Sequence, residues 1–543
     1  MSTSLPSTQL PPETKPVLIV GAGPTGLTAA LELSRLGVPV RLIEQQAGPS
    51  TTSRALAVHA RTLELLAPRG VADEMLHLGN KARFASLYGA TKRLAQLDLR
   101  DIPSRYNFVL LLAQSETERL LREQVARQGV AVEWGTTLAG LVQTDAQVQA
   151  VLRSPNGQLE EVALAYLLSA EGAHSLVRHT LGLPFAGRSL PQRYALADLH
   201  LEGNLPSDEL SVFLGNEELM ALFPLSSNRF RLIASEPDGP DTPPTLAELQ
   251  HLYDTHTSQS QPARLHEVVW TSRFRINSRM VERLRVGRIF LGGDAAHVHS
   301  PMGGQGMNTG IQDMLNLGWK LAAVWHGQAA AELLDTYEQD RLPVIQEIVG
   351  TTERATDLLT TSGPLVHKLL THALPLLLGS NLVQHKGAQV LSQVASHYRA
   401  SELSLTRHAG GTLHGGDRLP DLDVQDATGK TGPLYAQLDP SRLTLLLAAS
   451  SAPTSLSPTQ AAQLHPWQAT LQLRAVAPAA GTGSGWAEAI GTVPALLLVR
   501  PDAYLAVVVR ADTDGWAALL TWLHRWLPGR AAQAMGSQLK ETR

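Results

Sequence analysis

Cysteine is absent from this chain of 543 residues. Its absence excludes disulfide bonds, thiolate catalysis, iron–sulfur clusters and zinc sites with cysteine ligands. The chain also lacks a large excess of either sign of charge: its formal net charge is only -4, and its basic residues form no block. We therefore expect no dedicated surface for binding nucleic acid.

Long apolar stretches are missing as well, and no run approaches the roughly 18 residues of a membrane span. The first segment, "MSTSLPSTQLPPETKP", has neither the basic nor the apolar region of a signal peptide. Its composition predicts a disordered tail over residues 1–15. We expect a cytoplasmic protein with no membrane contact, long enough for about three domains.

A dinucleotide-binding pattern follows the tail, in "VLIVGAGPTGLTAALELSRLGVPVRLIEQQ". An apolar strand leads into G-x-G-x-x-G, a helix follows, and a second strand ends at Glu44. Gly21 permits a tight turn, Gly23 lets a pyrophosphate approach the backbone, and Gly26 lets the helix pack closely on the strand. The helix N-terminus attracts phosphate, and Glu44 can accept hydrogen bonds from ribose hydroxyls. The pattern predicts an adenine dinucleotide as ligand.

FAD is favoured over NAD(P), because after Glu44 the chain does not continue as a regular dehydrogenase βαβ unit. In "GPSTTSRALAVHARTLELLAPRGV", Arg54 and Arg61 can reach a pyrophosphate or the flavin edge. A solvated helix face is the alternative interpretation of Arg61. Gln114, just before a predicted helix, has an amide suited to a ribityl or ribose chain, and we add Leu138 to the candidate cofactor-binding residues.

A second strand-and-glycine segment is "GRIFLGGDAAHVHSPMGGQGMNTG", residues 287–310. Its start is typical of a buried strand, Asp294 stands at the strand's end, and a glycine-rich run follows. His297 and His299 suggest a metal site, but no third ligand stands at a suitable spacing. We expect local hydrogen bonding and packing from both histidines.

Residues 191–283 differ from the segments around them, because apolar runs of strand length alternate with Gly and Asn turns. This pattern predicts a mostly antiparallel sheet, which can wall a pocket for an apolar ligand. The candidates for that wall, each with a role in the core as its alternative, are Phe213, Met220, Leu222 and Phe223.

Three motifs, taken in order, resemble those of the FAD-dependent aromatic hydroxylases, the single-component flavoprotein monooxygenases of the para-hydroxybenzoate hydroxylase type. "GAGPTGL" with Glu44 is similar to the FAD-binding fingerprint of that family. "AEGAHSLVR" resembles its Asp-Gly motif, and the segment from "GRIFLGGD" to "NLGWKL" resembles its Gly-Asp motif. One position departs from the pattern, because Glu171 stands where the family usually has Asp, and this puts the NADPH contact in doubt more than FAD binding.

The resemblance implies an α/β fold in which a Rossmann-like FAD-binding domain carries an inserted, mostly antiparallel β-sheet domain for the substrate. The FAD-binding domain then covers residues 16–190 and, with a helical linker, residues 284–400, around a substrate domain at 191–283. Residues 401–543 resemble the thioredoxin-like α/β domain of the subgroup that acts on phenols and polyketide aromatics. Without cysteine this C-terminal domain cannot carry out thiol chemistry, which implies a structural or interface role.

The implied activity is hydroxylation of a phenolic or polycyclic aromatic substrate. NADPH or NADH reduces FAD, the reduced flavin reacts with O₂, and a C4a-hydroperoxyflavin transfers one oxygen to the ring. The cofactor carries this chemistry, so we expect no catalytic side chain and no metal. The alternative is a related FAD oxidoreductase (a Baeyer–Villiger oxygenase, a reductase or a halogenase) or, more distantly, a flavin-free binding protein. We also expect a homodimer.

The resemblance also assigns roles within residues 287–310. Residues 287–291 become the last central strand of the FAD sheet, and Asp294 binds a ribityl or ribose hydroxyl of FAD. Pro301 to Gly304 form the turn that faces the isoalloxazine ring. The next helix opens with Gly306, Met307 and Asn308, and its N–H groups stabilise negative charge on the reduced flavin.

Overall fold

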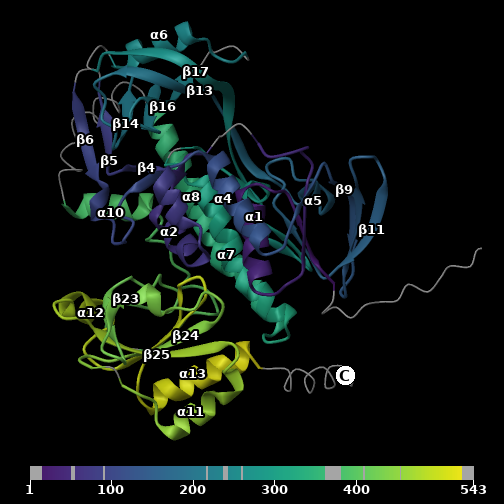
Figure 1. The fold of residues 1–543 in the computed structure, drawn as a ribbon, viewed down its shortest axis with the longest axis vertical. Helices are drawn as coiled ribbons and strands as arrows, with labels where there is room; N and C mark the ends of the chain where they lie inside the picture. The colour runs from purple at the N-terminus through teal and green to yellow at the C-terminus, as the bar shows by residue number, and fades with distance from the viewer. Residues whose placement is uncertain are drawn as a thin grey trace, which may run out of the picture.

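The computed structural model describes residues 15–50, 55–89, 92–215, 218–236, 242–257, 261–301, 303–360, 381–407, 410–452 and 454–528. Figure 1 shows three parts: a central sheet with its helices, a second large sheet above it, and a C-terminal module below. None of the described helices is long and apolar enough to cross a membrane.

The central part is built on a six-stranded sheet in the order β18-β19-β12-β1-β2-β8. All neighbouring strands are parallel except β18, which runs antiparallel to β19. The strands are β1 (Val17–Val20), β2 (Val40–Glu44), β8 (Val132–Trp134), β12 (Tyr166–Ser169), β18 (Arg285–Val286) and β19 (Ile289–Leu291). The strand expected at 287–291 is present over Ile289–Leu291 as β19, parallel to β12, and it starts later than expected because the chain turns at Gly287 (φ +60°) between the edge strand β18 and β19.

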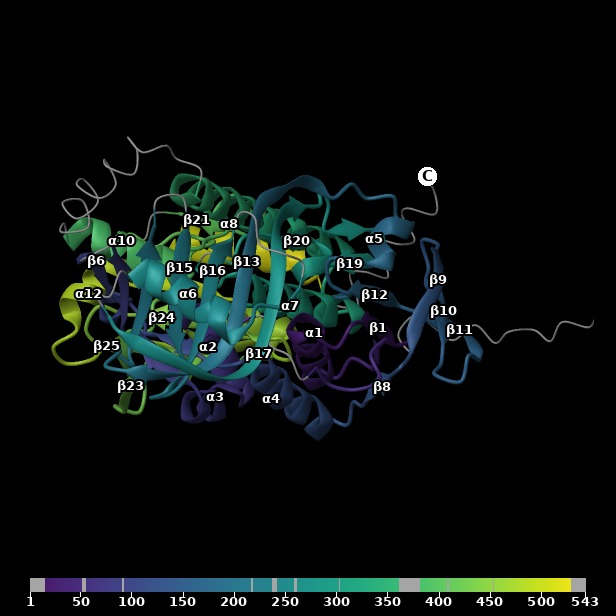
Figure 2. The same cartoon turned by 90° about the horizontal axis from the view of Figure 1, so that it is seen from above.

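The two faces of this sheet are covered by different elements. Val17 and Ile19 pack with the helices α1 (Pro24–Arg35), α4 (Gln114–Arg127) and α7 (Gly306–Trp325) on one face. Leu18 and Val20 point to the other face and pack against a three-stranded antiparallel sheet. That sheet consists of β9 (Thr137–Gln143), β10 (Val148–Arg153) and β11 (Leu159–Leu164), and it lies at one end of the molecule in Figure 2. The alternation explains why β1 is apolar at every position.

The second large sheet has eight strands in the order β20-β17-β13-β16-β15-β14-β5-β6 and is antiparallel except between β14 and β5. Its strands are β5 (Phe84–Tyr88), β6 (Arg93–Asp98), β13 (Ala186–Gly203), β14 (Glu209–Leu214), β15 (Leu219–Pro224), β16 (Arg229–Glu236), β17 (Ala263–Met280) and β20 (His297–Val298). The sheet is larger than the range 191–283 expected from the sequence, because β5, β6 and β20 come from outside it. The helix α6 (Leu246–Thr257) packs against this sheet.

Shorter elements join these two sheets. A small sheet is formed by β3 (Ala57–Val58), β4 (Asn80–Ala82) and β7 (Val109–Leu111). The other described helices before the C-terminal module are α2 (Ala60–Leu66), α3 (Ala72–Leu78), α5 (Leu176–Thr180), α8 (Thr336–Thr360) and α10 (Asn381–Leu391).

The C-terminal module contains a seven-stranded sheet in the order β21-β27-β26-β24-β25-β22-β23. Its strands are β21 (Leu405–Thr406), β22 (Asp423–Asp426), β23 (Thr431–Pro433), β24 (Leu443–Ala448), β25 (Leu471–Pro478), β26 (Ala495–Val499) and β27 (Leu505–Arg510), and its helices are α11 (Pro458–Leu464), α12 (Gly483–Ala489) and α13 (Thr513–Trp526). In chain order, α11 lies between the parallel strands β24 and β25, and the antiparallel hairpin β26–β27 is followed by α13. Trp319 of α7 packs into the core of this module, so the two parts share a buried boundary.

Candidate active site

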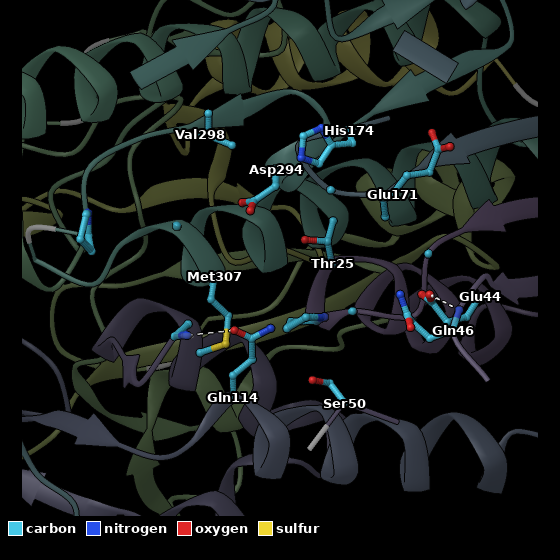
Figure 3. A pocket seen from close by; sticks show the side chains of 18 of the residues that line it. Thr25, Glu44, Gln46, Ser50, Gln114, Glu171, His174, Asp294, Val298 and Met307 are labelled. Atoms are coloured by element: carbon cyan, nitrogen blue, oxygen red, sulfur yellow. Dashed lines mark hydrogen bonds between the residues drawn. The ribbon is translucent and has the colours of Figure 1, made fainter. Parts of the chain in front are cut away.

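A cavity of about 770 Å³ lies between the carboxyl ends of the central strands, the start of α7 and the eight-stranded sheet (Figure 3). Its volume is typical of a site for a cofactor or a drug-sized ligand. Ten of the thirteen residues predicted to bind the cofactor line it: Gly21, Gly23, Glu44, Gln114, Leu138, Asp294, Pro301, Gly304, Gly306 and Met307. Gly26 and Asn308 are not among the lining residues, and Arg54 falls outside the residues that the structure describes.

The three glycines after β1 serve different purposes. Gly21 has a φ of +103°, and a Cβ there would stand 2.3 Å from the Ala170 carbonyl oxygen. A Cβ on Gly26 would stand 1.9 Å from the Gly21 carbonyl oxygen, so this glycine allows α1 to pack on the turn. Gly23 lines the cavity, and a Cβ there would have no described atom within 4 Å apart from its chain neighbours. The first two glycines are needed for packing, whereas the third leaves room for a ligand at the start of α1.

Glu44, at the end of β2, lies at one end of the cavity (Figure 3). Its Oε2 accepts a hydrogen bond of 2.8 Å from the Ala22 N–H, and its Oε1 accepts one of 2.9 Å from the Gln46 N–H. These contacts fix the carboxylate beside the glycine turn. The remaining lone pairs can accept hydrogen bonds from the hydroxyls of a ribose.

Asp294 follows β19 in a single turn of 3₁₀-helix, Gly293–Ala295, and its carboxylate points into the cavity in Figure 3. The turn requires Gly293, which has a φ of +57° and on which a Cβ would stand 2.4 Å from the Thr25 hydroxyl oxygen. The Gly293 N–H donates to Asp313 Oδ2 over 3.0 Å. The side chain of Asp294 is therefore exposed to the cavity, while the backbone of its turn is fixed by the hydrogen bond to Asp313.

The glycine-rich turn after Asp294 closes another side of the cavity. A Cβ on Gly304 (φ +62°) would stand 2.7 Å from the Ala57 Cβ, so this turn packs tightly against β3. Gly306 and Met307 begin α7, where the side chain of the N-cap residue Gln305 makes no capping hydrogen bond. The free N–H groups of that first turn and the positive end of the helix dipole stand beside the cavity.

The Asn308 side chain turns away from the cavity and is fully buried. Its Oδ1 accepts from the His59 N–H over 2.9 Å, and its Nδ2 donates to the carbonyls of Ala57 and Gly304. Asn308 thus joins α7 to β3 and α2, and any contact of this residue with a cofactor comes from its backbone.

The histidines near the turn have partners within the protein. His297 shares a hydrogen bond of 2.8 Å with Asp313 through Nε2, and His299 shares one of 2.8 Å with the Ser300 carbonyl through Nδ1. His59 contacts the Gly303 carbonyl over 2.8 Å, and burial lowers the pKa of its imidazole to about 4. Burial also lowers the pKa of His299 to about 4, so both rings stay neutral near pH 7. No group of three potential metal ligands occurs in the described ranges.

Gln114 is the first residue of α4, and its amide is oriented by the protein. Its Oε1 accepts from the Ala55 N–H over 3.0 Å, and its Nε2 donates to Glu118 Oε1 over 2.8 Å. Figure 3 shows it beside Met307, away from Glu44.

Both interpretations of Arg61 were wrong. Its side chain is fully buried, not solvated, and it does not line the cavity. It donates to Glu64, to the Tyr435 hydroxyl over 3.1 Å and to the Asp502 carbonyl over 2.6 Å. The last two partners belong to the C-terminal module, so Arg61 holds the two parts together. Nothing in the local sequence distinguishes this role from a cofactor contact.

The motif around Glu171 is also tied to the protein. The Glu171 carboxylate accepts from the hydroxyls of Ser169 (2.9 Å) and Ser175 (2.6 Å) and from two N–H groups at the start of α5. Arg178 is buried and donates to the carbonyls of Ala173 and Ala295. Arg178 therefore connects this motif to the turn that carries Asp294.

The eight-stranded sheet contributes Phe223, Arg231 and Ile233 to the cavity from β15 and β16, and Val298 from β20. Of the four residues proposed for this wall, only Phe223 lines it. Met220, Leu222 and Phe213 pack into the core on the other face of the sheet, as their alternative interpretation had it. Successive side chains of β15 and β16 point to opposite faces of the sheet, which separates the cavity-lining residues from the core residues. This alternation would also have predicted Arg231 and Ile233 as lining residues, once it was known which face of the sheet meets the cavity.

The residues around the cavity fit FAD. An acid for a ribose, an open glycine turn at a helix N-terminus, a second acid and a second helix N-terminus line one continuous cavity. These groups match, in turn, the adenosine ribose, the pyrophosphate, the ribityl chain and the electron-rich edge of a flavin. The fold and the site together define an FAD-binding oxidoreductase.

Comparison with known proteins identifies the family. A model of the FAD binding domain family matches residues 14–352. The chain is 34% identical to the 6-methylpretetramide 4-monooxygenase of Streptomyces rimosus over 97% of both chains, and 33% identical to the pentachlorophenol 4-monooxygenase of Sphingobium chlorophenolicum over 75% of this chain and 76% of that one. Its structure is similar to that of the anhydrotetracycline hydroxylase OxyS from Streptomyces rimosus, with a TM-score of 0.76, 31% identity and coverage of 94% and 99%. The chain belongs to the FAD-dependent aromatic monooxygenases.

Proposed function

We propose that this monooxygenase hydroxylates a polycyclic phenol of the polyketide type, with NADPH or NADH as reductant. The observation that carries the proposal is that the cavity extends from the FAD-binding groups to an apolar wall of Phe223 and Ile233. The similarity over nearly the whole chain to enzymes named for 6-methylpretetramide and anhydrotetracycline supports a fused-ring substrate.

Arg231 adds a charge requirement to this wall. Its guanidinium pairs with Asp198 through Nε (2.7 Å) and Nη2 (3.0 Å), and Arg229 approaches the same carboxylate at 3.6 Å. Asp198 thus lies between Arg231 and Arg229, and Arg231 brings a positively charged guanidinium to the cavity wall. A phenolate or enolate oxygen of the substrate suits this charge, and stabilising that anion makes the ring more electron-rich.

The rest of the site holds and shields the reacting groups. Bound FAD supplies the oxygen-activating chemistry after it is reduced. Glu44 and Asp294 orient the cofactor, and the first turn of α7 offers N–H groups to negative charge that develops beside it. The packed turn at Gly304 and the apolar sheet wall exclude water from the reacting atoms.

Isotope-labelled O₂ tests the proposal. A panel of fused-ring and single-ring phenols is screened for faster NADPH or NADH oxidation, and the products are analysed by mass. We expect one labelled hydroxyl on a fused-ring phenol and a weaker response to single rings. A labelled lactone or ester would show a Baeyer–Villiger oxygenase instead, and oxidation of the nicotinamide without incorporation would contradict hydroxylation.

Three finer predictions from the sequence accompany this proposal. They are a cytoplasmic location, a homodimer and a thioredoxin-like C-terminal module. The parallel pair β24–β25 around α11, followed by the hairpin β26–β27 and α13, supports the last of these. Light scattering on the purified chain decides the oligomeric state.

A further inference from the structure

A buried carboxylate stands directly behind the turn that carries Asp294. Asp313, in the second turn of α7, has no exposed surface. It accepts hydrogen bonds from the Gly293 N–H (3.0 Å), from His297 Nε2 (2.8 Å) and from Arg341 Nε (2.8 Å). Three donors from three elements therefore converge on one side chain that is not among the cavity-lining residues.

Arg341, in α8, continues this chain of contacts away from the cavity. Besides Asp313, its guanidinium donates to the Thr309 carbonyl over 3.3 Å and to the Tyr398 hydroxyl over 3.0 Å. Arg341 is fully buried, so each of these acceptors replaces a lost hydrogen bond to water.

Tyr398 belongs to the segment that leads into the C-terminal sheet and is packed on that module. Its N–H donates to the Gly416 carbonyl over 2.7 Å, and its ring lies 4.1 Å from the ring of Tyr504, centroid to centroid. The contacts from Tyr504 through Tyr398, Arg341 and Asp313 to Gly293 thus form an unbroken path from the C-terminal module to the cofactor turn.

The charge on Asp313 is permanent under ordinary conditions. Burial alone would raise the pKa of its carboxyl, but Arg341 and His297 beside it hold that pKa at about 2. A buried carboxylate keeps its partners strictly in place, because losing any one leaves a charged group unpaired at a cost of several kcal/mol. The path is therefore stiff in a way that apolar packing is not.

We propose that Asp313 is the positioning residue of the Gly293–Asp294 turn and that the C-terminal module, through Tyr398 and Arg341, raises the affinity of this turn for FAD. The module thereby contributes to the cofactor site without contacting it. This role needs no cysteine, and it holds whichever substrate the enzyme accepts.

The test compares FAD affinity in full-length variants. Tyr398→Phe keeps the ring beside Tyr504 and removes the hydroxyl that accepts from Arg341, and Asp313→Asn keeps the shape of the side chain and removes its charge. FAD is titrated into each FAD-free protein by fluorescence quenching, and the near-UV circular dichroism of the bound flavin is recorded. We expect the dissociation constant to rise by about threefold to thirtyfold, the range of coupling through such networks, with an altered flavin spectrum.

Arg105→Ala is the matched control, because Arg105 also joins the two parts through ion pairs with Asp421 and Asp423 but does not touch Asp313 or Arg341. It should bind FAD like the parent protein. The double variant Asp313→Asn with Tyr398→Phe should weaken binding by less than the product of the two single effects, because both break one path.

The proposal is overturned if Tyr398→Phe binds FAD with the affinity and spectrum of the parent, or if Arg105→Ala weakens binding as much as Tyr398→Phe does. If Asp313→Asn does not fold, Tyr398→Phe against Arg105→Ala decides the matter alone. Loss of thermal stability with unchanged FAD affinity would show a purely structural network and would also contradict the proposal.

Discussion

The cavity has a flavin half, built around the glycine turn, Asp294 and the start of α7, and a substrate half, built on the eight-stranded sheet. The flavin half presents backbone and the acids Glu44, Glu171 and Asp294, and its glycines Gly21 and Gly304 stand where a Cβ would collide with neighbouring atoms. The substrate half presents the side chains Phe223, Arg231 and Ile233 on regular strands. Substitution of these two packed glycines should therefore disturb the fold, whereas the substrate half can change its ligand without losing the fold.

Two glycines of the G-x-G-x-x-G motif, Gly23 and Gly26, give the largest expected contrast. Gly26→Ala places a Cβ 1.9 Å from the Gly21 carbonyl oxygen, so α1 must move off β1. We expect the free energy of unfolding to fall by more than about 3 kcal/mol, measured by urea denaturation of the FAD-free protein. Gly23→Ala meets no such clash and should keep its stability while binding FAD more weakly. Equal denaturation midpoints for the two variants would contradict this assignment.

The flavin half should also make the protein sensitive to acid. The folded state lowers the pKa of His59 from 6.5 to about 4, because the ring is buried. Between these values the unfolded chain binds a proton that the folded protein resists, so stability is full above about pH 6.5 and falls as the pH decreases toward 4. The expected loss for this one group is on the order of 3 kcal/mol.

Chemical denaturation at pH 7 and at pH 4 measures this loss, with His59→Gln as the comparison. The variant has lower stability at pH 7, because it loses the contact with the Gly303 carbonyl, but a shallower dependence on pH. His299 contributes in the same direction in both proteins. Parallel pH profiles of parent and variant would exclude His59 as the source.

Asp294→Ala removes one acid of the flavin half without disturbing the turn beneath it. The variant should lose FAD on gel filtration, with a dissociation constant about tenfold to a hundredfold higher, as for a lost hydrogen bond to a charged group. His297→Ala is the comparison: it removes one of the three partners of Asp313 but no cofactor contact, so it should keep FAD on the column with a smaller loss of affinity than the Asp294 variant, because Asp313 still holds the Gly293 N–H and Arg341. Retention of FAD by the Asp294 variant would refute its role as a cofactor contact.

These contrasts explain which features the sequence predicts. The turn at Gly21, the helix after it and Glu44 follow from local spacing, because a phosphate-binding turn needs residues within about 20 positions of one another. The start of α7 at Gly306 follows for the same reason. Most of the residues that line the flavin half can therefore be predicted from the sequence.

Features that depend on partners far away in the sequence cannot be predicted from local spacing. Which residues of β15 and β16 face the cavity depends on how the sheet is placed, and a shift of one residue exchanges the two faces. Strands β5 and β6 join the sheet from more than a hundred positions upstream of β14. Arg61 was misassigned because its partners, Tyr435 and Asp502, lie in another part of the chain.

The smallest expected effect separates the two faces of β15, where Phe223 lines the cavity and Leu222 packs in the core. Phe223→Ala should raise the KM for the aromatic substrate by about tenfold, equivalent to about 1.4 kcal/mol of lost apolar contact, with FAD affinity unchanged. Leu222→Ala should lower the free energy of unfolding by about 2–5 kcal/mol while KM stays near that of the parent. Steady-state kinetics and denaturation of both variants test this division. If Leu222→Ala shifts KM and Phe223→Ala does not, the sheet presents its other face to the substrate, and the proposed wall of Phe223, Arg231 and Ile233 is wrong.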